Sequence, residues 1–201
     1  MSNICQKVIT SCVGADCNNT IFTGMEGKAW IMNKTEVDSF TFDASNPNLI
    51  TAITMKENEG VAYPIYTIDQ LGKTPFTGTN TSMTEGNVQN AFTETFAFVV
   101  PDNSPTAAML LDNVANGRFC VVVKNEYTGA DGKGKFQVLG AKKGLVCSAM
   151  ERDAYSEDTN GGWAVTLTAE GTPNSALFIE HTTNSTVDTE SYLDSLVDCG
   201  D

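Results

Sequence analysis

Short apolar stretches, separated by Gly, Asn, Asp and Pro, follow one another along most of this chain, and threonine is frequent among them. This pattern is typical of a mainly β domain. Alternation is clearest at 92–98, where Phe92, Phe96 and Phe98 share one face of a strand. Glu94 falls on the same face, so we expect it to lie where this strand leaves the core. The expected strands are Lys28–Met32, Val37–Phe42, Leu49–Met55, Tyr63–Asp69, Phe92–Val100, Arg118–Tyr127, Lys135–Leu139, Leu145–Arg152 and Trp163–Thr168.

Two segments carry helical signals. The first helix is expected at about 104–116, where Ser104 caps the N-terminus, proline follows and Gly117 ends the helix. The second is expected at about 186–197, at the C-terminal end of the chain, with an apolar stripe of Tyr, Leu and Val. Its last turn carries Asp194 and Asp198, whose charge opposes the helix dipole. We therefore expect this second helix to be marginal unless it docks against the rest of the domain.

One stretch of the chain differs in composition from the rest. Glycine and polar residues at 127–134, 140–144 and 156–162 predict hairpin loops of ordinary length. Residues 70–91 form a much longer polar stretch with few apolar anchors. Loops of that length inside a compact domain are usually functional or interface-forming. We interpret the whole chain, 1–201, as one domain that carries a polar loop or an inter-subunit arm at 70–91.

Composition and charge narrow the class of protein. The 201 residues carry a formal net charge of -13, with 41% apolar and 18% charged residues. The chain is too apolar for a disordered acidic polymer, and too acidic to bind nucleic acid through its overall surface. No apolar run reaches the roughly 20 residues that cross a bilayer. The N-terminal residues lack a basic head followed by an apolar core, so we expect no signal peptide.

The acidic residues are unevenly distributed. No Lys or Arg follows Arg152, whereas residues 153–201 hold ten carboxylates. The preceding stretch gathers Lys133, Lys135, Lys142 and Lys143. This difference is consistent with a merely solvated surface. It is also consistent with complementary charge between neighbouring copies, or with an acidic surface that faces an anion without binding it.

The cysteines and the candidate catalytic groups point away from an enzyme or a metal protein. Of six cysteines, Cys120 and Cys147 lie in apolar strand patterns and are expected in the core. Near the N-terminus, cysteines 5, 12 and 17 lack the spacing of a structural zinc site, so free thiols are favoured over zinc or a disulfide. The sole histidine, His181, is expected at the surface. The acids at 153–158 lack the order of a calcium loop.

Sequence motifs of known chemistry are also missing. The chain has neither a GxSxG elbow nor a GxxxxGK[ST] loop. No segment brings together a nucleophile, a base and an oxyanion site. We therefore expect no catalytic residues, no cofactor and no metal site, and a protein that is not an enzyme.

Three consecutive segments resemble one known family. Phe136–Leu145, Cys147–Tyr155 and Glu157–Leu167 follow the order strand, glycine-bounded turn, "GL", acidic loop, "GG-aromatic" and a strand ending in "TL". This order resembles the C-terminal part of tail tube proteins from bacteriophages and prophages of gut Bacteroides-like hosts. The strand–helix–strand at 92–125 is similar to the helix that flanks the sandwich in that family. The resemblance covers about half of the chain and leaves 1–30 and 186–197 unexplained.

The resemblance implies a fold, partners and a location. It implies a β-sandwich or half-barrel protomer, of which six copies close a ring by strand pairing, and the rings stack into a tube that conducts DNA. An acidic lumen would let DNA pass without specific binding. The protein would assemble in the host bacterial cytoplasm and reside in the virion with other virion proteins. The residues expected in the inter-subunit arm are Lys73, Phe76, Thr79, Met83 and Asn87.

Other interpretations stay open at the level of sequence. The same β architecture would serve a capsid auxiliary, a decoration protein or a neck component. A cytoplasmic β domain that binds a metal or a sugar is another alternative, and a hydrolase with scattered carboxylates is the last. Assembly state separates the virion roles from the others.

Overall fold

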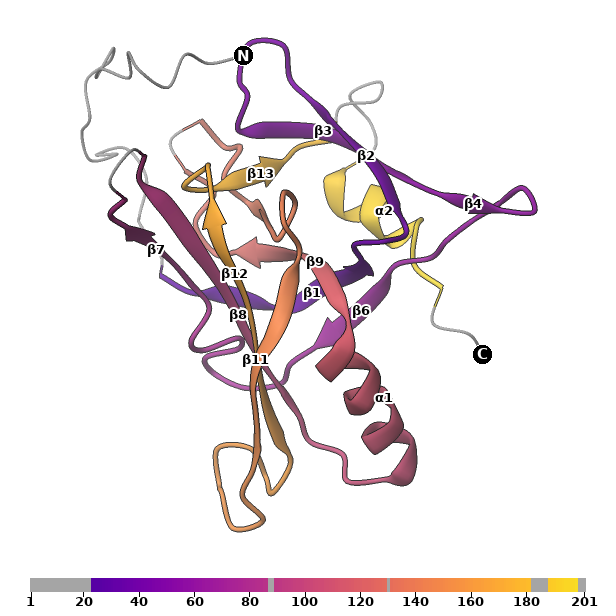
Figure 1. The fold of residues 1–201 in the computed structure, drawn as a ribbon, viewed down its shortest axis with the longest axis vertical. Helices are drawn as coiled ribbons and strands as arrows, with labels where there is room; N and C mark the ends of the chain where they lie inside the picture. Colours follow the sequence, from indigo (N-terminus) through magenta and orange to yellow (C-terminus); the bar gives the residue numbers. More distant parts are fainter. Residues whose placement is uncertain (1–22, 87–88, 130, 182–187, 199–201) are drawn as a thin grey trace.

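The computed structural model describes residues 23–86, 89–129, 131–181 and 188–198, and their fold is mainly β, as predicted. Two helices accompany the strands (Figure 1). The strands are β1 (Met25–Asn33), β2 (Val37–Phe42), β3 (Leu49–Met55), β4 (Glu57–Asn58), β5 (Val61–Ala62), β6 (Tyr66–Asp69), β7 (Asn80–Thr84), β8 (Ala91–Val100), β9 (Arg118–Asn125), β10 (Phe136–Leu139), β11 (Leu145–Arg152), β12 (Trp163–Thr172) and β13 (Leu177–Ile179). The helices are α1 (Pro105–Asn116) and α2 (Thr189–Asp194).

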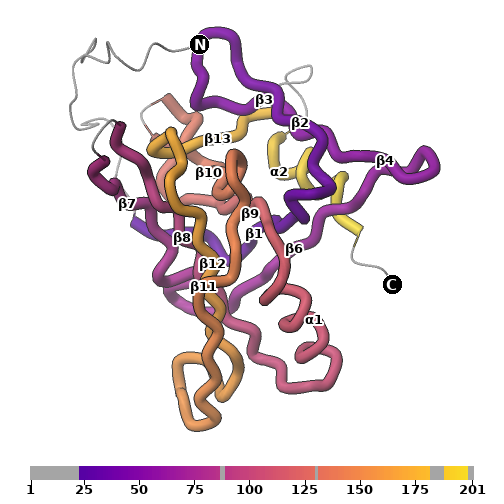
Figure 2. The backbone as a smooth tube through the Cα atoms, in the orientation of Figure 1, coloured from indigo at the N-terminus to yellow at the C-terminus, as the bar shows by residue number. Residues whose placement is uncertain are grey.

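Strand β9 is the centre of the main sheet. One of its edges pairs with β1, with Trp30 opposite Val122. Its other edge is shared, because β10 pairs with the second half of β9 and β11 pairs with its first two residues. From there β10 leads to β13, β3 and β2, whereas β11 leads to β12, β8 and β7. The sheet therefore divides at β9 and curves (Figure 2), which confirms the predicted β-sandwich or half-barrel class.

Both faces of β9 are covered by apolar side chains. Five consecutive residues, Phe119–Val123, are buried, as expected for a strand that lies between two layers. Cys120 and Val122 face a cluster that also includes Trp30, Met32, Ile50, Ile53, Phe136, Leu177 and Leu193. Phe119, Val121 and Val123 face a second cluster with Phe76, Phe96, Phe98, Leu111, Leu145 and Leu167. The continuous apolar run of β9 is therefore the sequence signature of a two-sided core.

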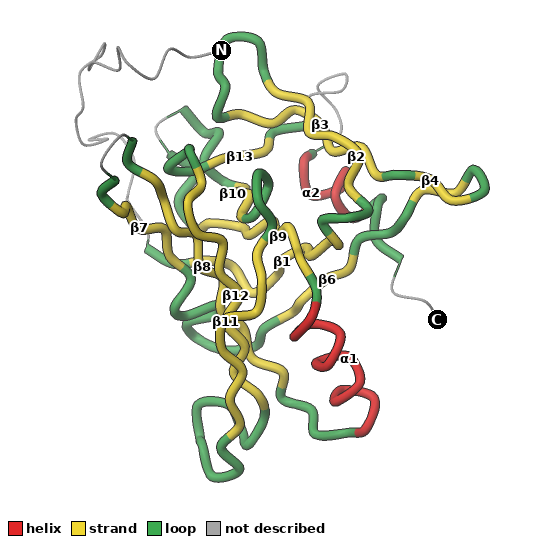
Figure 3. Tube along the Cα trace, in the orientation of Figure 1, coloured by secondary structure: helices red, strands yellow, loops and turns green. Residues whose placement is uncertain are grey.

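Helix α1 forms where its capping signals predict it. Ser104 is the N-cap, and its Oγ accepts a hydrogen bond from the Ala107 N–H at 3.2 Å. Pro105 occupies the first turn, and Gly117 follows the last residue. The helix (red in Figure 3) buries Ala107, Leu111 and Val114 against the second cluster. The helix extends beside the β11–β12 hairpin at the lower end of the molecule (Figure 1).

The C-terminal helix is shorter than the expected 186–197. Helix α2 spans six residues, Thr189–Asp194, and residues 186 and 187 lie outside the described part of the chain. The helix ends because the next residues pair elsewhere. Ile65 donates its N–H to the Leu196 carbonyl, and the Asp198 N–H donates to the Ile65 carbonyl. The segment is thus docked, the condition that we expected this helix to need.

Glu94 lies inside the core, so the prediction that it marks the end of the buried face is wrong. Only 3% of the Glu94 surface is exposed, and its carboxylate accepts a hydrogen bond from the Gly140 N–H at 2.8 Å. Burial raises the pKa of Glu94. Gly140 begins the predicted 140–144 turn with a φ of 74°, a conformation that favours glycine.

The two cysteines that the structure describes have different surroundings. Cys120 is fully buried, as predicted, and burial raises the pKa of its thiol to about 12. Cys147 is only half-buried, so the prediction of a core position is met in part. Both are free thiols. Cysteines 5, 12, 17 and 199 lie outside the described residues.

Candidate functional site

The described part of the polar stretch at 70–91 lies along strand β8. Residues 70–79 form a loop over this strand, and residues 80–84 form β7, which pairs antiparallel with it. The sequence did not predict β7, because its residues, NTSMT, contain one large apolar side chain and lack apolar alternation. The segment is held in place by its pairing with β8, a ten-residue strand.

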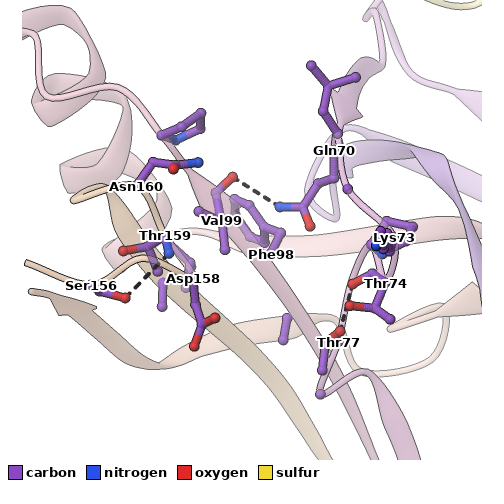
Figure 4. A pocket seen from close by; sticks show the side chains of 18 of the residues that line it. Gln70, Lys73, Thr74, Thr77, Phe98, Val99, Ser156, Asp158, Thr159 and Asn160 are labelled. Carbon is purple, nitrogen blue, oxygen red and sulfur yellow. Dashed lines mark hydrogen bonds between the residues drawn. The ribbon is translucent and has the colours of Figure 1, made fainter.

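Gln70 fixes the start of this loop. Its backbone N–H donates to the Gly27 carbonyl at 2.7 Å. Its side-chain amide donates to the Val99 carbonyl at 3.0 Å and accepts from the Phe76 N–H at 3.1 Å. The amide of Gln70 thus joins the loop to β8 (Figure 4) and bridges the turn between Gln70 and Phe76.

The residues predicted to form an inter-subunit arm have unequal positions in the structure. Lys73 is exposed, and Met83 on β7 is 59% exposed. Thr79 is half-buried, and its Oγ1 accepts a hydrogen bond from the Ala97 N–H at 3.1 Å. Phe76 is 2% exposed, packs 5.3 Å from the Phe96 ring and has a φ of 57°. Asn87 lies outside the described residues.

This arrangement separates the roles of the predicted residues within one protomer. Phe76 anchors the loop to its own core, whereas Lys73 and Met83 are available to a partner. The participation of these residues in contacts between copies stays a prediction.

An open groove of about 970 Å³ lies beside this loop. One wall is the loop at 69–78, and the opposite wall is the loop at 156–160 between β11 and β12 (Figure 4). The floor is the outer face of β8 and β12, with the small side chains Ala97, Ala164 and Thr166. The walls carry hydroxyls and amides, together with Asp69, Asp158 and Lys73.

Three strands form open edges of the main sheet. Within the described residues, β7 pairs only with β8, β2 only with β3 and β6 only with β1. In this part of the chain, β7 and β2 therefore present backbone donors and acceptors on their outer sides. Open edges of this kind are templates for pairing with another chain.

Charged side chains hold α2 against the sheet. Lys124 of β9, although only 8% exposed, binds Glu26 at 2.6 Å and Glu190 at 2.7 Å. Burial lowers the pKa of Lys124, but the bonds with these two carboxylates outweigh it and leave the pKa raised. The sequence did not predict this cluster, because it joins residues of two strands and a helix that are far apart in the chain.

A second charged cluster binds the end of the same helix. The Asp194 carboxylate accepts from the Lys28 ammonium at 2.7 Å and from the Trp30 indole N–H at 2.8 Å. Burial raises the pKa of Asp194, but these two donors outweigh it and leave the pKa lowered. The charge that opposes the helix dipole is therefore compensated by β1.

Tyr192 completes the docking of α2. Its hydroxyl donates to the Ile53 carbonyl at 2.8 Å and accepts from the Ile53 N–H at 3.0 Å. The His181 ring stacks on the Tyr192 ring with centroids 3.7 Å apart. His181 was expected at the surface; it is half-buried, and its Nδ1 lies 3.0 Å from the Thr51 carbonyl oxygen.

Comparisons with protein-family models, with curated proteins and with solved structures found no match for this chain. Among the described residues, no cluster of three or more His, Cys, Asp and Glu side chains has the arrangement of a metal site. In the same part of the chain, neither helix has the length and apolar character needed to span a bilayer.

Proposed function

We propose that this protein is a structural virion protein, the tail tube subunit of a bacteriophage or prophage. Copies of the chain assemble into rings of six, and the rings stack into a tube that conducts DNA. The role is structural and not enzymatic. The subunits assemble in the cytoplasm of the bacterial host and reside in the virion, in contact with other virion proteins. The order of motifs at 136–167 and the mainly β fold support this proposal.

The observation that carries the proposal is the set of open sheet edges. Strand β7 at one end of the curved sheet and β2 at the other each pair on one side only within the described residues. Edges of this kind favour aggregation unless they are protected. A ring in which one edge of each copy pairs with a different edge of the next protects both edges at once. The exposed Met83 on β7 would be covered by the same contact.

The net charge of -13 supports the transport role in this proposal. A phosphate backbone is repelled by a wall of carboxylates, so DNA would move through the tube without adhering. This argument requires that carboxylates line the inner wall of the ring.

The test is electron microscopy of the purified full-length protein by negative stain. Stacked rings or tubes with a central channel are the expected result, and class averages of end views would give the number of subunits. Single rings that never stack would favour a neck component, and decoration of capsids without rings would favour a capsid auxiliary. A protein that remains monomeric at high concentration, with neither rings nor tubes, would contradict the proposal.

A further inference from the structure

Four cationic side chains gather around the β10–β11 turn, residues 140–144. They are Lys34, Arg118, Lys142 and Lys143, and we call them the cationic turn. The Lys34 ammonium donates to the Ala141 carbonyl at 2.7 Å. Arg118 donates to the Lys143 carbonyl at 3.2 Å, and Lys143 donates to the Glu170 carbonyl at 2.9 Å. The group thus holds one third of the twelve basic side chains of a chain with net charge -13.

Backbone and aromatic groups hold these four cations in place. Among the described residues, all ion pairs involve Lys28, Lys124 or Lys133, so none of the four cations is paired with a carboxylate. Lys142 lies 4.2 Å from the centroid of the Phe42 ring and Lys34 lies 4.9 Å from that of Phe40. The positive charge of the turn is therefore not neutralised within the described part of the protomer, although carboxylates are twice as numerous as cations in the chain.

The opposite end of β11 carries the reverse charge. The loop between β11 and β12 contains Asp153, Glu157 and Asp158, and Glu151 is the last residue but one of β11, before Arg152; we call these four carboxylate residues the acidic tip. All four are exposed, and none forms an ion pair among the described residues. Tyr155 lies among them with 94% of its surface exposed. The hairpin projects at the lower end of the molecule in Figure 1.

The two charged groups cannot meet within one molecule. The turn at 140–144 directly precedes β11, and the acidic tip begins at the last residues of that strand. An eight-residue strand separates its ends by roughly 25 Å. Opposite charges at the two ends of one element are arranged for a head-to-tail contact between copies, and such a contact repeats along the direction of the strand.

We infer that the acidic tip of one copy docks on the cationic turn of the next. The partner is a second copy of this chain, and the contact is the one that stacks successive copies. This inference rests on the proposed function, and it names the two surfaces that stacking would join. The exposed Tyr155 ring packs against the half-buried Phe40 and Phe42 rings beneath the lysines, while the carboxylates meet the cations.

Two observations favour a second copy over nucleic acid as the occupant of the cationic turn. A duplex carries phosphate along its whole length and would extend beyond the turn over the rest of a chain with net charge -13, whereas a hairpin tip is narrow enough to contact the turn alone. Phosphate also gives no role to the exposed Tyr155 or to the aromatic rings below the lysines.

The test reverses each charged surface in the full-length protein. One variant carries Lys142→Glu and Lys143→Glu, and the other carries Glu157→Lys and Asp158→Lys. Each replaces attraction by repulsion at one side of the contact, so each is expected to weaken self-association, measured by analytical ultracentrifugation at low ionic strength, by about tenfold or more. Self-association of the wild type should also weaken as ionic strength rises.

A mixture of the two variants is the decisive sample. The first variant keeps its acidic tip, which can bind the unchanged cationic turn of the second variant. The reversed tip of the second variant can in turn bind the reversed turn of the first. Mixing is therefore expected to restore association to within a few-fold of the wild type, a result that misfolding of either variant cannot produce. The control variant, Lys133→Glu with Lys135→Glu, makes the same change in net charge as the turn variant but at the opposite end of β10, and it should associate like the wild type.

Several outcomes would overturn the inference. The first is unchanged association of both variants, and the second is a loss of association that mixing does not restore. The third is binding of a duplex DNA fragment that the turn variant loses and the tip variant keeps, which would assign the turn to nucleic acid. Tubes that persist in both variants would remove this inference and leave the tail tube proposal intact. Association that mixing restores, but that never produces rings, would support the contact between tip and turn and contradict the tail tube proposal. A wild type that is strictly monomeric would contradict both.

Discussion

Glu94 is a carboxylate in an otherwise apolar face of β8, and its single described partner is the N–H of Gly140. The alternation of Phe92, Phe96 and Phe98 identifies the face but does not reveal that a glycine turn from another hairpin lies against it. Because burial disfavours the charged form, the folded protein binds the Glu94 proton more tightly than the unfolded chain does. The stability contributed at this position is therefore greatest at low pH and falls as pH rises through the folded-state pKa.

Glu94→Gln should remove this pH dependence while an amide oxygen still accepts from Gly140. Relative to that of the wild type, the free energy of unfolding of the variant should rise by about 1 kcal/mol between acidic and neutral pH. Urea titrations across that range measure the difference. Glu85→Gln, at an exposed carboxylate next to β7, is the matched control. A constant difference between Glu94→Gln and the wild type at every pH would contradict the prediction.

Asp194 combines an exposed ion pair with a hydrogen bond to a fully buried tryptophan. Its partner Lys28 is 31% exposed, whereas Trp30 is completely buried. The Trp30 indole is fully buried in the folded protein, and a buried donor that loses its acceptor costs more than a lost surface ion pair. The same acid, judged from the helix dipole alone, looks unfavourable.

Two substitutions at Asp194 separate these contributions. Asp194→Asn keeps an oxygen that accepts from Trp30 and should cost under about 1 kcal/mol, whereas Asp194→Ala should cost about 1–3 kcal/mol. Because the pKa of Asp194 is lowered in the folded state, the stabilisation is present at neutral pH and is lost as pH falls from the unfolded value through the folded value. Thermal unfolding at neutral and acidic pH measures both effects, and equal costs for the two variants would show that the indole bond contributes nothing.

At the scale of elements, α2 illustrates a helix that tertiary contacts stabilise. Six residues form too short a helix to persist alone in water. Leu193 is fully buried, and Tyr192 binds both backbone groups of Ile53 on β3. The helix therefore serves as a cover for the free side of β3 at this residue, with the ion pairs of β1 and β9 around it.

Tyr192→Phe should weaken this cover without changing its shape. The substitution keeps the ring that stacks on His181 and leaves the N–H and carbonyl of Ile53 without the hydroxyl. We expect a loss of about 1–2 kcal/mol in free energy of unfolding, together with faster hydrogen exchange at Ile53. Tyr155→Phe, at an exposed ring, should cost nothing. Unchanged exchange at Ile53 in Tyr192→Phe would sink this interpretation of the helix.

At the scale of the whole molecule, the polar stretch at 70–91 is divided between the core and the surface. Phe76 is buried among the residues of its own protomer, whereas Lys73 stands exposed at the groove. An arm that is covered on assembly should therefore become protected near Lys73, while the packing of Phe76 remains as it is.

Limited digestion with trypsin tests this expectation. Cleavage after Lys73 should be rapid in the monomer and at least about tenfold slower in the assembled protein, since a covered loop opens less often. Mass spectrometry identifies the cut, and Lys73→Gln should abolish it in both states. Equal rates in monomer and assembly would remove residues near Lys73 from the contact between copies.

The sequence by itself determines the elements that depend on neighbours along the chain. The bounds predicted for Val37–Phe42, Leu49–Met55 and Leu145–Arg152 agree with β2, β3 and β11, because alternation and turn residues are local signals. The cap of α1 at Ser104 is equally local. Short or polar strands such as β4, β5 and β7 escaped prediction because they have little apolar periodicity of their own.

Only the tertiary structure decides which distant residues meet. Strand β7 exists because β8 pairs with it, and the loop before it is fixed by a bond from Gln70 to Val99. Lys28 and Asp194 meet although 166 positions separate them. The lysines at 142 and 143 were recognised as a charged group from the sequence, but the fold adds Lys34 and Arg118 and leaves all four without a carboxylate in the described chain. Local patterns carry no record of such contacts, because their free energy arises only when the sheet has closed around them.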